Sequence, residues 1–194
     1  MRSFSRRPAT YADLIALPEH FVGELIDGEL VASPRPGPIH AEVSSLLGAE
    51  LVGAFQLGRF GPGGWRIIDE PELHLGGDVL VPDLGGWRRE RLPRLPEEAF
   101  FSIAPDWVCE VLSPSTARVD LVQKLPKYAS AQVSHAWILN PSQRTLQVFR
   151  LEHGRWTFAA AFSGEDKVRA EPFDAFELEL VRLWGPDEDA PGQP

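Results

Sequence analysis

The sequence predicts an α/β fold: one domain, residues 1–184, in which helices flank a mixed central β-sheet. Short strand-like runs alternate with two long helical patterns, and no internal repeat interrupts them. The 194 residues suit one domain with a good core, and 43% apolar and 24% charged residues are typical of a globular protein. The acidic, Pro/Gly-rich segment 185–194 is predicted to be a disordered tail.

Local signals in the first third predict a helix, a hairpin and a second helix. Thr10 is a suitable N-cap for a short helix that ends before Pro18. Two strand-like runs in "FVGELIDGELVAS" flank the turn pair Asp27-Gly28, which predicts a β-hairpin. After a proline-rich loop, "IHAEVSSLLGAELVGAF" repeats its apolar residues at helical spacing and predicts a long amphipathic helix.

The remaining elements are mostly strands. Residues 65–84 predict short strands, which a Pro- and Arg-rich connection links to a buried strand over Trp107–Leu112. The next helix is expected from a cap at Thr116 to about Ala131, with a kink or restart at Pro126. Three further strands follow in "HAWIL", "RTLQVFRL" and "RWTFAAAF". The last segment, "FDAFELELVRLW", fits either a helix or an extended segment.

Charge and cysteine content exclude some functions. The net charge of −9 counts against a protein that coats nucleic acid non-specifically, because phosphate affinity comes largely from Lys and Arg. A nuclease stays possible, since carboxylates around a metal lower the net charge. The arginines of "GGWRRERLPRLP" beside Trp87 could contact DNA, although solvated arginines are the commoner outcome. The one cysteine, Cys109, forms no disulfide or cysteine zinc cluster and is expected in the core.

The sequence also bears on location. Its first ten residues contain basic residues without a following apolar run, so no secretory signal is expected. No apolar stretch approaches the roughly 18 residues of a membrane helix. We therefore expect a cytoplasmic protein without a membrane partner.

Two carboxylates point to a metal site. Glu110 lies within an apolar strand, where a lone charge is costly. Strand alternation puts Glu110 on the opposite side from Cys109. Asp83 is expected at the end of the preceding strand, so it lies close to Glu110 if these strands are neighbours. Two close carboxylates repel unless a cation lies between them, and oxygen ligands suit Mg²⁺ or Mn²⁺.

The helix after this strand supplies a basic residue. Asp120 and Lys124 are four residues apart and share one helix face. A strand–turn–helix connection lays that helix over its strand, so Lys124 can reach Glu110. An ammonium group there could orient a water or neutralise a phosphate. A helix-surface lysine paired with Asp120 is the competing interpretation.

At these residues the sequence resembles the Uma-type restriction endonuclease family of the PD-(D/E)XK nuclease superfamily. The resemblance rests on "VPDL", on "PDWVCEVLSPST" with the following Asp and Lys, and on "HAWILNPSQRTLQVFRL". "GELIDGELVASPRPGPIH" is similar to the family's opening hairpin and histidine. The resemblance covers about residues 11–183 and implies a restriction-endonuclease-like fold.

The resemblance also implies roles for individual residues. Pro82-Asp83 corresponds to the PD element and Glu110 to the acidic residue of the (D/E)XK element. The lysine expected two residues later is Leu112 here, and the family pattern implies that Lys124 replaces it from the helix. The implied function is a Mg²⁺-dependent endonuclease that hydrolyses DNA.

Two further residues are weaker site candidates. Glu24 in the hairpin could be a metal ligand or a supporting acid, and an exposed strand position is about as plausible. His40 at the start of the long helix could contact phosphate or carry a proton. A histidine without a catalytic role is an equally good interpretation.

Rival functions stay open. The acidic charge and the missing strand lysine favour a non-catalytic nucleic-acid-binding or assembly module that retains the nuclease fold. A hydrolase of another phosphoester, such as RNA or a nucleotide, is the second rival. If the protein cuts duplex DNA, a homodimer is expected, and apolar C-terminal residues would form its contact surface: Trp137, Phe149, Trp156 and Phe158.

Overall fold

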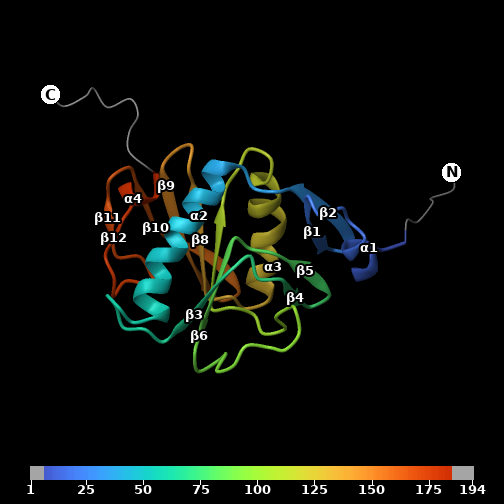
Figure 1. The fold of residues 1–194 in the computed structure, drawn as a ribbon, viewed down its shortest axis with the longest axis horizontal. Coiled ribbons are helices and arrows are strands. Elements are labelled where there is room, and N and C mark those ends of the chain that lie inside the picture. The colour runs from blue at the N-terminus through green and yellow to red at the C-terminus, as the bar shows by residue number, and fades with distance from the viewer. Residues whose placement is uncertain (1–6, 185–194) are drawn as a thin grey trace.

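A six-stranded mixed β-sheet runs through the molecule (Figure 1). The computed structural model describes residues 7–184. In spatial order the strands are β10 (Arg155–Ser163), β9 (Thr145–Glu152), β8 (His135–Asn140), β7 (Trp107–Val111), β6 (Leu84–Arg88) and β3 (Trp65–Asp69). β7 and β8 pair in parallel, and the other neighbours are antiparallel. The predicted mixed sheet is thus confirmed.

A smaller sheet contains the predicted hairpin. Its spatial order is β2 (Glu29–Pro34), β1 (Phe21–Ile26), β5 (Asp78–Leu80) and β4 (Leu73–Leu75). Asp27 and Gly28 have φ angles of 54° and 75°, as a type I′ hairpin turn requires. The short helix α1 (Tyr11–Ile15) begins with a capping box between Thr10 and Asp13, which confirms the predicted cap.

The helices follow the predicted order with two local differences. α2 (Pro38–Leu51) continues as a π-helix, η1 (Val52–Gln56), and the second long helix begins as a π-helix, η2 (Val119–Lys124), before α3 (Leu125–Ser130). Pro126 lies in the first turn of α3, which confirms the expected restart. The C-terminal segment contains both forms, because β11 (Lys167–Val168) and β12 (Leu178–Glu179) pair before α4 (Val181–Trp184).

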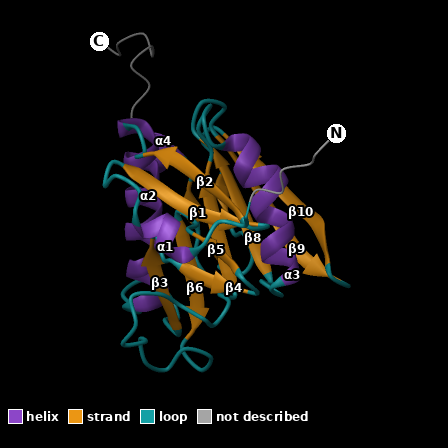
Figure 2. Cartoon of the chain, turned by 90° about the vertical axis from the view of Figure 1, so that its right-hand side faces the viewer, coloured by secondary structure: helices purple, strands orange, loops and turns teal. Residues whose placement is uncertain are grey.

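Two hydrophobic cores lie on opposite faces of the central sheet. Trp107, Cys109 and Val111 face the core that includes α2, η1 and the C-terminal segment. Val108 faces the other core, which includes α3 and the smaller sheet. Figure 2 shows helices on both sides of the strands. The alternation expected for β7 is therefore confirmed, and Cys109 is a core residue.

The region 65–88 differs from the sequence expectation. The run "DVLVPDL" is not one strand, because β5 belongs to the smaller sheet and β6 to the central sheet. Asp83 lies between these strands, directly before β6 rather than at the end of its predecessor. β6 itself was expected to be part of a loop. Its Gly86 permits close strand packing, because a Cβ there would lie 3.0 Å from the ring of Trp107.

The aromatic residues expected on the surface are mostly internal. Trp87 is fully buried and donates a hydrogen bond to the carbonyl of Ile103 (2.8 Å), so it is not free to contact DNA. Trp137 is also buried, and Phe149 and Trp156 pack against the second core. Of the four residues proposed for a dimer surface, Phe158 has the largest exposed fraction, 57%.

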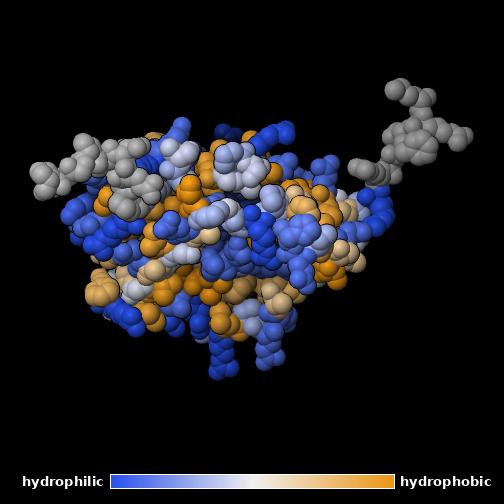
Figure 3. Space-filling view, turned by 45° about the horizontal axis from the view of Figure 1, so that its top comes forward, coloured by the Kyte–Doolittle hydropathy of each residue, from blue (hydrophilic) through white to orange (hydrophobic). Residues whose placement is uncertain are grey.

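Exposed apolar side chains are scattered over the surface. On the face drawn in Figure 3, hydrophobic residues are interspersed with hydrophilic ones. Such scatter is normal for a globular protein. Within residues 7–184, no helix combines the length and apolar character needed to span a bilayer.

Candidate active site

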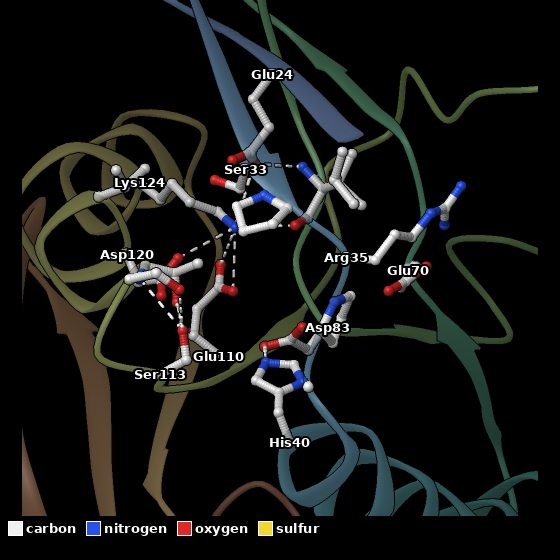
Figure 4. A pocket seen from close by; sticks show the side chains of 18 of the residues that line it. Glu24, Ser33, Arg35, His40, Glu70, Asp83, Glu110, Ser113, Asp120 and Lys124 are labelled. Atoms are coloured by element: carbon white, nitrogen blue, oxygen red, sulfur yellow. Dashed lines mark hydrogen bonds and ion pairs between the residues drawn. The ribbon is translucent and has the colours of Figure 1, made fainter. Parts of the chain in front are cut away.

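A polar cavity of about 280 Å³ lies where the β1–β2 hairpin, the start of α2, the end of β7 and η2 meet. Figure 4 shows side chains from all four elements around it. The five predicted site residues all line this cavity: Glu24, His40, Asp83, Glu110 and Lys124. Segments up to about 100 residues apart in sequence thus contribute to a single site.

Lys124 lies at the centre of a cluster of carboxylates. Its Nζ is 3.0 Å from Glu110 Oε1, 3.2 Å from Glu24 Oε1 and 3.5 Å from Asp120 Oδ1. Nζ also donates a hydrogen bond to the carbonyl of Val81 (2.9 Å). The Lys124 side chain is only 4% exposed. Lys124 is therefore not a helix-surface lysine paired only with Asp120.

Burial alone lowers the pKa of the Lys124 ammonium. The surrounding charges of Glu110, Glu24 and Asp120 outweigh that effect and hold its pKa well above its ordinary value. Lys124 therefore stays protonated at neutral pH and serves as a fixed positive charge.

Glu110 has a second buried partner on the same helix. The hydroxyl of Tyr128 donates a hydrogen bond to Glu110 Oε1 (2.6 Å). Burial strongly raises the pKa of Glu110; Lys124 opposes this rise, and Asp120, Asp83 and Glu24 add to it. Glu110 thus lies where its ionised form needs more positive charge than Lys124 provides.

Asp83 lies against the end of β7. Its Oδ2 accepts a hydrogen bond from the backbone N–H of Val111 (2.6 Å) and lies 3.2 Å from Nε2 of His40. Burial lowers the pKa of His40, but the hydrogen bond and charge of Asp83 outweigh it, so the pKa is raised. The structure therefore brings His40 and Asp83 together, a pairing that the sequence did not indicate.

Glu24 connects the hairpin to this cluster. Its side chain is 7% exposed, so it is not an exposed strand residue. Oε1 accepts a hydrogen bond from the backbone N–H of Val81 (2.8 Å) as well as contacting Lys124. The backbone of Val81 thus binds Glu24 through its N–H and Lys124 through its carbonyl.

Some members of the site were missed from sequence. Tyr128 follows Lys124 by four residues, so helical spacing could have placed it on the same face. Asp120 was considered only as a partner of Lys124, yet it is 5% exposed and lines the cavity. Arg35 and Glu70 also line the cavity, and they come from loops that give no periodic signal.

The donor chemistry of the cavity suits a divalent cation. Five carboxylates line it: Glu24, Glu70, Asp83, Glu110 and Asp120. The fixed cations among its lining residues are two, Arg35 and Lys124. Carboxylate oxygens are the ligands that Mg²⁺ and Mn²⁺ prefer. Within residues 7–184, however, no three His, Cys, Asp or Glu side chains already converge as a ligand set. The donor types fit a metal, while the side chains are held by internal hydrogen bonds.

Comparisons with known proteins bear on the fold and the family of the chain. A crystal structure described as a putative nuclease belonging to DUF820, from Anabaena variabilis ATCC 29413, has a TM-score of 0.73 to this chain. It is 23% identical, and the match covers 91% of this chain and 98% of that one. This likeness confirms the restriction-endonuclease-like fold. A comparison with curated proteins found no match.

A family model settles the relationship. The model of Uma2, described as "Putative restriction endonuclease", matches residues 9–181. This range includes the hairpin, both long helices and every side chain of the cavity. The chain therefore belongs to the Uma2 family of putative restriction endonucleases.

Proposed function

We propose that the protein is a metal-dependent endonuclease that hydrolyses DNA phosphodiester bonds. The observation that carries the proposal is the buried cluster of Glu24, Glu110 and Asp120 around Lys124, next to Asp83. Burial raises the pKa values of Glu110 and Asp120, and buried cavity groups with such shifts are typical of functional sites. Membership of a restriction endonuclease family supports a nuclease role.

Asp83 and Glu110 would hold Mg²⁺ or Mn²⁺ in this proposal. Such an ion supplies a Lewis acid for the phosphate and lowers the pKa of a bound water. Asp83 would keep its bond to the Val111 N–H, which fixes the carboxylate at the rim of the cavity. Glu110 would lose its excess proton affinity, because added positive charge favours the ionised carboxylate.

Lys124 acts as a charged hydrogen-bond donor in this proposal. Because the surrounding carboxylates raise its pKa, it cannot remove a proton from water at neutral pH. It can orient the attacking water and offset the negative charge that develops on the phosphate. Glu24 holds Lys124 in position, and His40 holds Asp83.

The test is metal binding and cleavage by the wild type and by Asp83→Asn. Calorimetry with Mn²⁺ should detect binding to the wild type and at least a tenfold weaker affinity in the variant, because a charged ligand is lost. The variant should keep its melting temperature in metal-free buffer, since asparagine retains an oxygen for the Val111 N–H. A wild type that neither binds Mn²⁺ nor cuts DNA would refute the proposal.

One observation favours a second function, a non-catalytic nucleic-acid-binding or assembly module. Lys124 already gives Glu110 a positive partner, and Asp83 already has His40 and the Val111 N–H. Both carboxylates thus have protein partners without a metal. The calorimetric experiment separates the two functions, because the module requires no carboxylate-dependent metal binding.

The assembly state and substrate are also proposals. A homodimer would place two sites against the two strands of a duplex. Light scattering at tens of micromolar should then give twice the mass of the chain. Incubation with DNA, RNA and nucleotides in Mn²⁺ separates DNA cleavage from hydrolysis of other phosphoesters.

A further inference from the structure

A second cavity, of about 500 Å³, adjoins the candidate active site. It lies between the start of α2, the turn that precedes η2, and the β8–β9 turn at Asn140–Ser142. His40 and Ser113 line both cavities. The volume lies within the range of about 300–1,000 Å³ that is usual for small-molecule sites.

The chemistry of this second cavity contrasts with that of the active site. Its walls include Pro38, Ile39, Leu112 and Pro141, and no Asp, Glu, Lys or Arg is among the described residues that line it. The active-site cavity, in contrast, is lined by five carboxylates. In the proposed reaction the charged phosphate would bind in the active-site cavity. The second cavity suits an uncharged, largely apolar group.

We propose that this second cavity, the base pocket, binds the nucleobase of an unpaired nucleotide next to the phosphate that is cut. The proposal rests on the nuclease function proposed above. His40 is one of four residues that line both cavities, with Gly37, Ser113 and Pro114, and its Nε2 lies 3.2 Å from Asp83 Oδ2. Because the two cavities adjoin, a phosphate beside Asp83 and a base in the second cavity would both lie next to His40, as neighbouring parts of a single nucleotide.

Asn140, a polar residue that lines the base pocket, can form a hydrogen bond with an edge of the base. Asn140 Oδ1 accepts a hydrogen bond from Ser142 Oγ (2.7 Å), and Asn140 Nδ2 donates one to Gln143 Oε1 (3.2 Å). These bonds fix the amide within the turn. An amide nitrogen carries two hydrogens, so Asn140 retains one that can be donated to a base acceptor.

The base pocket implies a substrate class. A base that is stacked and paired within a duplex cannot enter a separate cavity, so it must be unpaired or flipped out. Single strands, overhangs and duplexes with an unpaired nucleotide meet this condition. We therefore infer a preference for DNA that has an unpaired nucleotide at the cut site.

The experiment measures binding without cleavage, with Ca²⁺ in place of Mg²⁺. The probes are a short single-stranded DNA with one 2-aminopurine, whose fluorescence reports stacking, and the matched duplex. We expect the wild type to bind the single strand at least about tenfold more tightly than the duplex. Ala117→Phe, which fills the pocket from its wall, should weaken single-strand binding about tenfold or more and abolish the fluorescence change.

Ala49→Phe is the matched control, because Ala49 is an exposed residue of α2 that does not line the pocket. It should leave binding unchanged. Ile39→Ser is the second pocket variant. Because Ile39 is 70% exposed, this substitution removes an apolar wall without disturbing the fold, and it should also weaken single-strand binding.

The experiment distinguishes failure of the base-pocket proposal from failure of the proposed nuclease function. Equal affinity for single strand and duplex, with no effect of Ala117→Phe or Ile39→Ser, would overturn the base pocket even if the wild type cuts DNA. That result is also expected if the cavity holds a peptide of a partner protein. Pocket-dependent single-strand binding by a wild type that never cuts DNA would support the base pocket and remove the catalytic proposal.

Discussion

At the residue scale, Lys124 is the side chain on which the candidate site depends most. It is the one fixed cation that contacts Glu24, Glu110 and Asp120 among the ion pairs of residues 7–184. Removing one partner of a buried charge cluster leaves the others uncompensated, at a typical cost of about 3–5 kcal/mol. The same ammonium is proposed to act on water or phosphate. Stability and catalysis are therefore coupled at this residue.

We predict that Lys124→Met lowers the metal-free free energy of unfolding by about 3–5 kcal/mol. With saturating Mn²⁺, the single-turnover cleavage rate should fall by roughly 10²-fold or more, the usual effect of removing a donor that stabilises transition-state charge. Urea denaturation and rapid-quench assays measure the two quantities. Lys127→Met is the matched control, because Lys127 lies on the same helix and pairs with Asp27 and Asp78 near the surface. Similar losses in both variants would show that the Lys124 cluster has no special role.

The raised pKa of Glu110 makes the stability of the folded protein depend on pH. Its pKa in the folded protein is raised well above the ordinary value of 4.5, chiefly by burial, so the folded state holds the proton more tightly than the unfolded state does. This contribution to stability is complete below pH 4.5 and is lost as the pH rises through the folded-state pKa. The raised pKa of Lys124 acts in the same direction, but only above its ordinary value of 10.5.

We therefore predict that metal-free protein loses stability as the pH rises from about 4.5 toward neutrality. Asp120, whose pKa is also raised by burial, adds to this slope. Glu110→Gln should flatten the slope, and its effect is read from urea denaturation at several pH values. A slope of the same size in Glu110→Gln would assign the pH dependence to other groups.

At the scale of elements, the candidate site depends on how the β1–β2 hairpin docks. Glu24 accepts the Val81 N–H from the loop after β5, so a partly buried hydrogen bond joins the hairpin to the site. We predict that Glu24→Ala lowers the free energy of unfolding by about 1–3 kcal/mol, because it leaves that N–H unpaired. Glu24→Gln retains an acceptor oxygen and should cost less. Equal losses in urea denaturation would mean that the charge of Glu24, not its hydrogen bond, holds the hairpin.

The same elements show how far sequence reasoning reaches. The hairpin and the alternation of β7 could be predicted, because a turn pair and a two-residue period are local signals. The break between β5 and β6 could not. "DVLVPDL" reads as one apolar run, and only tertiary pairing sends its two ends to different sheets. Asp83 and Glu110 were correctly expected to be close. The reason was partly incorrect, because Asp83 lies directly before β6 and not at the end of one continuous strand.

The site residues divide in the same way. Lys124 and Glu110 lie on consecutive elements, so connection geometry predicts that they are close. The contact between His40 and Asp83 joins the start of α2 to the segment before β6, and no sequence period links these segments. The places of Arg35 and Glu70 in the cavity could not be predicted either, because both residues lie in loops, which have no sequence period. Local sequence patterns therefore predict the contact of Lys124 with Glu110. The contact of His40 with Asp83 depends on tertiary packing, which the sequence pattern does not indicate.

At the scale of the whole molecule, the net charge of −9 constrains how the proposed DNA substrate can bind. DNA affinity that comes from Lys and Arg contacts falls steeply with salt, by a slope of about −0.7 per contacted phosphate for single strands. Lys124 is enclosed by carboxylates, and Arg35 is the other fixed cation lining the cavity. Few basic side chains at the site are thus free to bind phosphate.

We therefore predict weak DNA binding without divalent metal, because the five carboxylates of the cavity repel phosphate. Adding Ca²⁺ should strengthen binding by at least about tenfold, since the ion reverses the local charge that phosphate meets. The slope of log affinity against log salt should be shallower than about −2, as expected for fewer than three phosphate contacts. Fluorescence anisotropy of a labelled single strand across a KCl series measures both. A steep slope that Ca²⁺ does not alter would place DNA on a basic surface outside the cavity, because affinity would then arise from arginine and lysine contacts and not from the carboxylate site.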